Sequence, residues 1–342
     1  MQYEQDGRDH GRSGGDELGA QRAHWARAGL KGIDLMAPRR LSDLEIAGCE
    51  MAAAVHFLAI GAPSPTASWI AFSLVAGLEN MVTQALQINW NAPWWEAVRS
   101  LGQPALASWT AGAGVAQALN AVGPAPVSFV PHHALAEGQA YERFIFERRA
   151  VPTRDNLHDF LNGLIWLRYP RAKRRMNALQ AQEIAANGVQ ATRGPVRDAI
   201  TVFDENGALL AAPEPLMSAL RERQWDELFG PLRPLWGQAR LWLLGHAALE
   251  KLVSPYKSIT AHVMAVPKEL RTPDEADEWL ADWLCAERLV PKPFVPLPLL
   301  GIPGWWSDNE DAGFYDDKAV FRPKRAALAE SAGRSAVRQK AL

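Results

Sequence analysis

The chain has 342 residues, of which 48% are hydrophobic and 22% are charged. A chain of this length buries enough apolar surface to fold without a disulfide framework or a structural metal. Its 36 basic and 38 acidic residues nearly cancel, which argues against a dedicated nucleic-acid-binding protein and against a polybasic membrane protein.

The cysteines and the N-terminal segment indicate the cellular compartment of the protein. Cys49 and Cys285 belong to no C-x-x-C motif, which excludes a thiolate zinc site and fits a reducing cytoplasm. Residues 1–24 are polar and rich in glycine, without the apolar segment of a signal peptide, so we expect a disordered leader. We expect one globular domain over residues 25–323 and a flexible tail over residues 324–342.

Residues 51–78 contain no charged side chain and are numerous enough to cross a bilayer. Pro63 and Pro65 divide this stretch into two short apolar pieces, and neither piece is long enough to span a membrane. We therefore expect no membrane span. The prediction is a buried helix over 42–60, a turn at the prolines, and a mostly helical segment over 69–88.

The middle of the chain combines predicted strands and helices. Its β-branched and aromatic residues predict short strands over 127–130 and 141–146. One helix is expected over 156–169, where Pro170 follows, and a second over 171–187, where Gly188 provides the usual C-terminal glycine.

After residue 200, residues that favour turns and helix caps indicate where the next elements begin and end. Asn206 and Gly207 lie between two apolar runs and favour the tight turn of a β-hairpin. Helices are expected over 216–229 and 234–253, and another begins at the motif Thr272-Pro273-Asp274-Glu275. These elements together predict the α+β class, as a helix-rich single domain with a small antiparallel sheet.

The run from Val151 to Gly163, V-P-T-R-D-N-L-H-D-F-L-N-G, resembles the signature of an uncharacterised bacterial family, domain of unknown function 3025. Further matching stretches are Arg193-Gly194, Phe203 to Gly207, Gly245-His246, Glu250-Lys251, and Pro255 to Lys257. The resemblance covers roughly residues 125 to 323 and implies no activity. A function must therefore be argued from the residues.

Two predicted helices carry polar side chains beside their apolar faces. On the 156–169 helix, the arc next to the apolar one holds short polar and aromatic side chains: His158, Asp159, Asn162 and Trp166. On the 234–253 helix, Trp242, His246 and Glu250 recur every four residues and lie along one stripe. Such faces are typical of the wall of a polar cleft.

His262 lies just beyond the second helix, on a predicted strand over 258–264. We expect a site in which three imidazoles and one carboxylate meet: His158, His246, Glu250 and His262. Such a set suits Zn²⁺ or another divalent transition metal with an open position for water. The function predicted is a metal-assisted hydrolase or lyase that acts on a small or anionic substrate.

Further residues are assigned to catalysis and to substrate binding. The candidate catalytic residues are those able to move or position a proton: Asp159, Asn162, Glu250 and Lys257. The candidate substrate-binding residues are three arginines and a tryptophan: Arg154, Arg193, Arg197 and Trp166. An alternative is that these arginines only pair with the nearby carboxylates Asp155, Asp198 and Asp204.

The competing interpretation is a non-catalytic scaffold or partner-binding module. In that case the histidines and carboxylates form a hydrogen-bond network that holds the elements together. The exposed pair Trp305-Trp306 would then suit a protein partner of unknown kind. Whether the protein is an enzyme is therefore left open by the sequence.

Residues 143–197 form a basic segment with 11 basic and 4 acidic residues. Phosphate backbones attract such a surface, yet the acidic stretch 308–317 could cover it within the same molecule. We therefore favour a small-molecule or anionic ligand over nucleic acid.

Overall fold

A computed structural model describes residues 85–123, 126–188 and 192–324. All of them belong to one compact unit, Ser73–Leu342. The predicted leader, the helix over 42–60 and the uncharged stretch over 51–78 lie outside the described residues. So do most of the 69–88 segment and nearly all of the tail, and the domain boundaries remain predictions. Among the helices that are described, none is both long and apolar enough to cross a bilayer.

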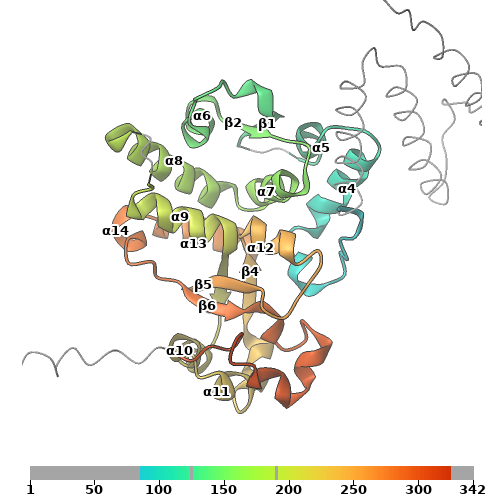
Figure 1. Ribbon diagram of the computed structural model, residues 1–342, viewed down its shortest axis with the longest axis vertical. Coiled ribbons are helices and arrows are strands. Elements are labelled where there is room, and N and C mark those ends of the chain that lie inside the picture. Colours follow the sequence, from blue (N-terminus) through green and yellow to red (C-terminus); the bar gives the residue numbers. More distant parts are fainter. Residues whose placement is uncertain (1–84, 124–125, 189–191, 325–342) are drawn as a thin grey trace, which may run out of the picture. The chain divides into compact units, whose positions relative to one another are not determined.

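The first half of the described chain is mostly helical (Figure 1). Its elements are η2 Pro93–Trp95, α4 Arg99–Thr110, α5 Val115–Ala121, β1 Ser128–Pro131, η3 His132–Ala134, α6 Tyr141–Arg148, β2 Ala150–Thr153, α7 Leu157–Arg168, α8 Pro170–Asn187 and α9 Pro195–Asn206. Strands β1 and β2 pair in parallel, with Phe129 opposite Val151. This short pair leads directly into α7.

The second half contains the larger sheet. Its elements are β3 Gly207–Ala211, α10 Glu214–Glu222, α11 Trp225–Phe229, η4 Arg233–Gln238, β4 Arg240–Leu243, α12 His246–Lys251, β5 Thr260–Val266, α13 Pro273–Trp283, α14 Ala286–Leu289, β6 Val295–Pro298, η5 Leu299–Gly301, η6 Ser307–Glu310 and η7 Ala312–Asp316. The strand order is β4-β3-β5-β6.

The sheet is mixed and not antiparallel as predicted, because β3 and β5 run parallel while β4 and β6 pair antiparallel at its edges. Every residue of β3 is buried, as expected for a central strand covered on both faces. In Figure 1, α9 and α12 lie on one side of the sheet, and α10 and α11 lie on the other. The α+β class is confirmed: the described part is helix-rich and contains small sheets of two and four strands.

Several predicted boundaries agree with the structure. The helix predicted over 171–187 is α8, and Gly188 follows it with a φ of 71°. Thr272 caps α13 through a hydrogen bond that its side chain accepts from Glu275 N. The helix predicted over 156–169 is α7, which Asn156 caps through a hydrogen bond that its side chain accepts from Asp159 N.

Three predicted elements are wrong, and the helix predicted over 216–229 is two helices, α10 and α11. The segment 141–146 is part of helix α6, because Phe144 and Ile145 bury one helical face. No hairpin forms at Asn206-Gly207, since α9 continues to Asn206 and β3 starts at the next residue. The helix predicted over 234–253 is η4, strand β4 and the short helix α12. A short apolar run such as Leu241 to Leu244 suits a buried helix or a strand equally well.

The N-terminus of α8 is capped from a distant helix. Asp277 of α13 is buried, and its carboxylate accepts hydrogen bonds from Arg171 N at 3.0 Å and Ala172 N at 2.8 Å. These amides belong to the first turn of α8 and have no partner within the helix. Asp277 therefore fixes where α8 begins.

Replacing Asp277 with alanine is expected to lower the free energy of unfolding by about 1–3 kcal/mol, because two buried amides lose their acceptor. Asp277→Asn keeps one acceptor oxygen and should cost less. Urea denaturation measures both effects. The control is Asp282→Ala, an exposed position on the same helix, which should stay within about 0.5 kcal/mol of the wild type. Equal stabilities of the two alanine variants would contradict this role for Asp277.

Candidate metal site

Four helices bring polar side chains together on one side of the large sheet. His158 lies in the first turn of α7, and Lys173 lies on α8. Asp204 and Glu205 lie in the last turn of α9, while His246 is the first residue of α12. Glu250 follows one turn later on α12. We call these six residues and Asn162 of α7 the α7–α12 cluster.

A close backbone approach sets the position of α12 against α9. The amides of Leu244 and Gly245 both donate to the carbonyl oxygen of Gly207, at 3.0 and 2.9 Å. A Cβ atom at Gly245 would lie 2.5 Å from Asn206 Cα and 2.6 Å from Glu205 O. Only glycine fits such a gap. The start of α12 therefore contacts the end of α9, which places His246 beside Asp204 and Glu205.

The His158 ring lies between two residues of α12. Its Nδ1 atom is 2.7 Å from Glu250 Oε2, and its Nε2 atom is 3.0 Å from His246 Nε2. The two rings meet edge to face, with centroids 4.5 Å apart. Because a carboxylate only accepts hydrogen bonds, the proton on this side belongs to His158 Nδ1. A neutral His158 therefore presents the lone pair of Nε2 to His246.

Glu205 completes a group of three possible metal ligands. Its Oε2 atom lies 3.4 Å from His246 Nε2. One ligand atom from each of His158, Glu205 and His246 lies within 4.8 Å of the other two. Two ligands of a tetrahedral Zn²⁺ ion lie about 3.3 Å apart, given bond lengths of about 2.0–2.1 Å. The spacing thus suits a cation of this size with small side-chain adjustments, and leaves a fourth position for water.

Asp204 and Lys173 form a second layer behind the histidines. The Lys173 ammonium is buried and donates to Asp204 Oδ1 at 2.5 Å and to Asn162 Oδ1 at 2.9 Å. It also lies 5.2 Å from the ring centroid of Trp166. The other carboxylate oxygen, Asp204 Oδ2, is 3.9 Å from His246 Nδ1. That buried nitrogen has no hydrogen-bond partner.

The local charges shift the pKa values of the cluster in different directions. Burial lowers the pKa of His246 to about 4, so its ring is neutral at pH 7. The hydrogen bond to Glu250 raises the pKa of His158. Burial raises the pKa of Glu205. Burial works in the same direction on Asp204, but the Lys173 ammonium and the two histidines together hold the pKa of Asp204 below its usual value.

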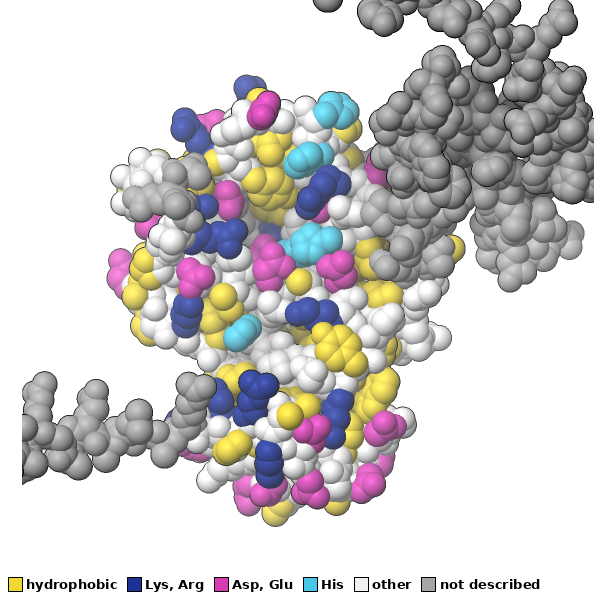
Figure 2. All heavy atoms as spheres, viewed as in Figure 1, with side chains coloured by type: hydrophobic (Ala, Val, Ile, Leu, Met, Phe, Trp, Pro, Cys, Tyr) yellow, Lys and Arg dark blue, Asp and Glu magenta, His cyan; other side chains and the backbone are white. Residues whose placement is uncertain are grey.

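The formal charges of the cluster favour a bound cation. The cluster has three carboxylates, those of Asp204, Glu205 and Glu250, and one ammonium, that of Lys173. A divalent cation would balance the two excess negative charges. Asp204 and Glu205 also lie at the C-terminus of α9, where the helix dipole disfavours negative charge. His158, Glu205 and Glu250 are each a little over one-third exposed, so solvent reaches the site. On the face drawn in Figure 2, histidine and acidic side chains adjoin at the surface.

The structure brings together only part of the predicted metal-ligand set. His158, His246 and Glu250 meet as expected, although Glu250 contacts the far nitrogen of His158. The expected convergence of His262 is wrong: it lies on β5 opposite Pro296, and its ring faces Phe294 at 6.5 Å. The predicted stripe through Trp242 is also wrong, because Trp242 belongs to β4.

Asp159 and Arg154 hold the loop before α7. Asp159 Oδ1 accepts from Arg154 Nη2 at 2.9 Å, and Oδ2 accepts from the backbone amide of Arg154 at 2.7 Å. Both oxygens of this carboxylate are therefore engaged. The Tyr141 hydroxyl interacts with Asn162, and burial raises the pKa of Tyr141.

The remaining predicted residues lie in other surroundings. Arg197 is 3.6 Å from Glu142, and Arg193 is exposed. Lys257 is 3.4 Å from Asp317 and lies over the ring of Phe314. The carboxylates expected to pair with the arginines have other partners: Asp198 with Lys292, Asp204 with Lys173, and Asp155 with the amide of Val115.

The predicted hairpin at Asn206-Gly207 placed Asp204 and Glu205 directly before a turn, and so neither was predicted on a helix or in the metal site. The buried positions Val196, Ile200 and Phe203 have helical spacing. That periodicity was the available signal, because it extends the helix past residue 203 and places both carboxylates on its last turn.

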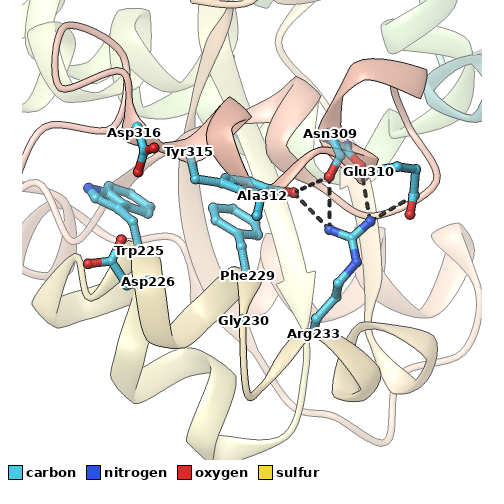
Figure 3. Close-up of a pocket in the computed structure, with 10 residues that line it drawn as sticks. All are labelled: Trp225, Asp226, Phe229, Gly230, Arg233, Asn309, Glu310, Ala312, Tyr315 and Asp316. Carbon is cyan, nitrogen blue, oxygen red and sulfur yellow. Dashed lines mark hydrogen bonds and ion pairs between the residues drawn. The ribbon is translucent and has the colours of Figure 1, made fainter.

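A separate cavity of about 290 Å³ lies between α11, η4 and the segment of η6 and η7 (Figure 3). Its one basic side chain, Arg233, donates to Tyr315 Oη at 2.9 Å and pairs with Glu310 at 2.7 Å. Asn309 accepts from the same guanidinium. Because these polar groups already have partners, the cavity offers less to a ligand than the α7–α12 cluster does.

Comparison with known proteins adds a family and no activity. The family model described as "Protein of unknown function (DUF3025)" matches residues 127–325, which include the whole α7–α12 cluster. No curated protein and no solved structure matches the chain.

Gly245→Ala is expected to lower the free energy of unfolding by about 1–3 kcal/mol, because the added methyl group meets the backbone of α9. Thermal or urea denaturation measures the loss. Gly237→Ala is the matched control, since a Cβ there has nothing within 4 Å. An unchanged stability of the Gly245 variant would show that α9 and α12 are not held by this contact.

Proposed function

Since this chain belongs to the DUF3025 family, whose description names no activity, we propose from the site geometry that it is a metal-assisted hydrolase or lyase. The observation that carries the proposal is the convergence of His158 Nε2, His246 Nε2 and a Glu205 carboxylate oxygen within 4.8 Å. These three side chains would hold Zn²⁺ or a similar divalent transition metal. The substrate class we favour is a small or anionic molecule.

The hydrogen-bond requirements of the two imidazoles support this assignment. With a cation between the Nε2 atoms, both rings carry their proton on Nδ1. His158 then donates to Glu250, and His246 Nδ1 faces Asp204 at 3.9 Å. Carboxylates commonly orient ligand histidines by accepting a hydrogen bond from Nδ1, as Glu250 does for His158. Without a cation, one ring must donate to the other, and a neutral His246 that donates through Nε2 leaves Nδ1 as a buried acceptor without a donor.

The roles of the other residues follow from their partners. A bound divalent cation would polarise a substrate oxygen and make a coordinated water more acidic. Glu250 contacts His158 Nδ1, on the side of the ring away from the metal position, so its carboxylate would orient that ring. Asp159 is not suited to accept a proton from such a water, because both of its oxygens bind Arg154. Lys173 would hold Asp204 in its ionised form.

The competing proposal is the non-catalytic scaffold, in which the same side chains only join α7, α9 and α12. The direct contact between His158 and His246 at 3.0 Å is consistent with it. Metal content separates the scaffold from the metal centre, because the scaffold needs no ion.

We also expect a cytoplasmic location for this protein, on the basis of the two separated cysteines.

The protein loaded with Zn²⁺ and dialysed is expected to retain about one ion per chain, and Glu205→Gln and His158→Ala should lose it, because each removes a ligand from a three-ligand site. Elemental analysis measures the content. His262→Ala is the control and should retain the ion, since His262 lies outside the cluster. Circular dichroism in chelator checks that each variant is folded. Zinc retained by folded Glu205→Gln and His158→Ala variants would contradict the assignment.

Glu250→Gln tests the residue behind His158. Loss of the carboxylate that orients His158 is expected to weaken Zn²⁺ affinity by about 10–100-fold without abolishing binding. A competition titration with a zinc indicator measures it. Glu227→Gln, an exposed residue on α11, is the control. Equal affinities in the two variants would leave Glu250 without a role in metal binding.

A further inference from the structure

A second cavity, of about 410 Å³, lies beside α6 and the first turns of α8. We call it the arginine cavity. The lining residues that matter here are four arginines and two aromatic residues: Arg149, Arg171, Arg174, Arg175, Phe146 and Trp166. No aspartate or glutamate lines it. Its volume falls in the range of small-molecule sites, about 300–1,000 Å³.

Two of the four guanidinium groups are free to bind a ligand. Arg171 pairs with Glu278 at 2.8 Å, and Arg175 Nε donates to the carbonyl oxygen of Leu284 at 2.9 Å. Arg149 and Arg174 are exposed, and neither has a carboxylate within ion-pair distance in the described part of the chain. Unpaired guanidinium groups around one cavity suit an anion with several oxygen atoms, above all phosphate.

The backbone at Arg149 is in an unusual conformation. This residue ends α6 with φ 51° and ψ 37°, a left-handed backbone conformation that residues other than glycine and asparagine rarely adopt. Its amide donates to Ile145 O at 2.8 Å, which closes the helix. An arginine therefore occupies a backbone position that suits glycine, and its side chain lines the cavity.

The aromatic lining adds a second type of contact. Phe146 is 50% exposed, which is unusual for a large apolar side chain in the described residues. Trp166 is buried, and the ammonium of Lys173, a residue of the α7–α12 cluster, lies over its indole ring. A flat ring can stack on an exposed aromatic side chain whatever its hydrogen-bonding pattern. The lining therefore combines groups for phosphate with a surface for a planar ring.

We propose that the arginine cavity binds a small molecule that carries phosphate on a flat ring system, of the kind that a nucleoside diphosphate represents. The proposal does not rest on the metal centre, because none of its residues belongs to the ligand set. Trp166 follows His158 and Asn162 at intervals of four along α7, so the cavity lies beyond the cluster on the same helix.

The surroundings of the cavity favour a small ligand over nucleic acid. Outside it, most basic residues of this segment are paired, among them Arg143 with Glu147, Arg168 with Asp274, and Arg197 with Glu142, whereas Arg148 and Arg193 are exposed. The acidic stretch 308–317, named above as a possible cover for the basic segment, provides none of these partners. A nucleic acid needs a continuous row of free cations, whereas here the ion pairs interrupt such a row and two free guanidinium groups line one cavity.

The test is calorimetric titration with adenosine 5′-diphosphate in the presence of EDTA, which removes metal from the His158 site. One molecule is expected to bind per chain. Arg174→Ala and Arg149→Gly should each weaken binding at least tenfold, and glycine suits the backbone of residue 149. Arg143→Ala, on the same helix as Phe146 but outside the cavity, is the control and should bind as the wild type does.

Separate probes distinguish the two kinds of contact. Inorganic pyrophosphate should bind more weakly than the diphosphate nucleotide, and adenosine should not bind measurably. Phe146→Ala should weaken nucleotide binding several-fold and leave pyrophosphate binding unchanged. Equal affinities for pyrophosphate and nucleotide would overturn the stacking role of Phe146.

Three results would overturn the site itself. The first is the absence of nucleotide and pyrophosphate binding at millimolar concentration. The second is nucleotide binding that persists when Arg149 and Arg174 are both replaced, or that is lost in His158→Ala, which would place it elsewhere. The third is a short single-stranded DNA that binds more tightly than the nucleotide and displaces it, which would assign the surface to nucleic acid.

Discussion

The candidate site depends on one steric constraint, the contact of α12 with the end of α9 at Gly245. The two amides that donate to Gly207 O and the lack of room for a Cβ atom fix this contact. It places the first residue of one helix beside the last turn of another. Because β3 starts directly after α9 and pairs with β5, the sheet also fixes the position of the α9 C-terminus. The positions of His246 and Glu205 follow from it.

The electrostatics of this junction run against what stability alone would favour. Acidic side chains at a helix C-terminus face the negative end of the helix dipole, and a buried lysine costs desolvation energy. The structure offsets these terms by pairing Lys173 with Asp204, but Glu205 keeps no basic partner among the described residues apart from the imidazoles. Proteins commonly accept such local costs at functional sites. A divalent cation would supply the missing positive charge.

Local signals in the sequence predicted the helices that carry half of the site. The C-terminal glycine of α8 was readable, and so was the spacing of four between His246 and Glu250. That spacing is why one histidine ring fits between the two residues. The carboxylate ligand escaped prediction because Asn206-Gly207 has the composition of a hairpin turn, while packing of Phe203 extends the helix instead. His262 was misjudged because strand pairing, a long-range contact, decides which way it faces.

The central claim is that His158, His246 and Glu205 coordinate one metal ion. Anomalous diffraction from crystals of the zinc-loaded protein, collected on both sides of the zinc absorption edge, tests it most directly. The account predicts a single strong peak about 2.0–2.2 Å from both Nε2 atoms and from a Glu205 oxygen. A zinc peak elsewhere, or none at this position while the two histidines stay hydrogen-bonded to each other, would contradict it.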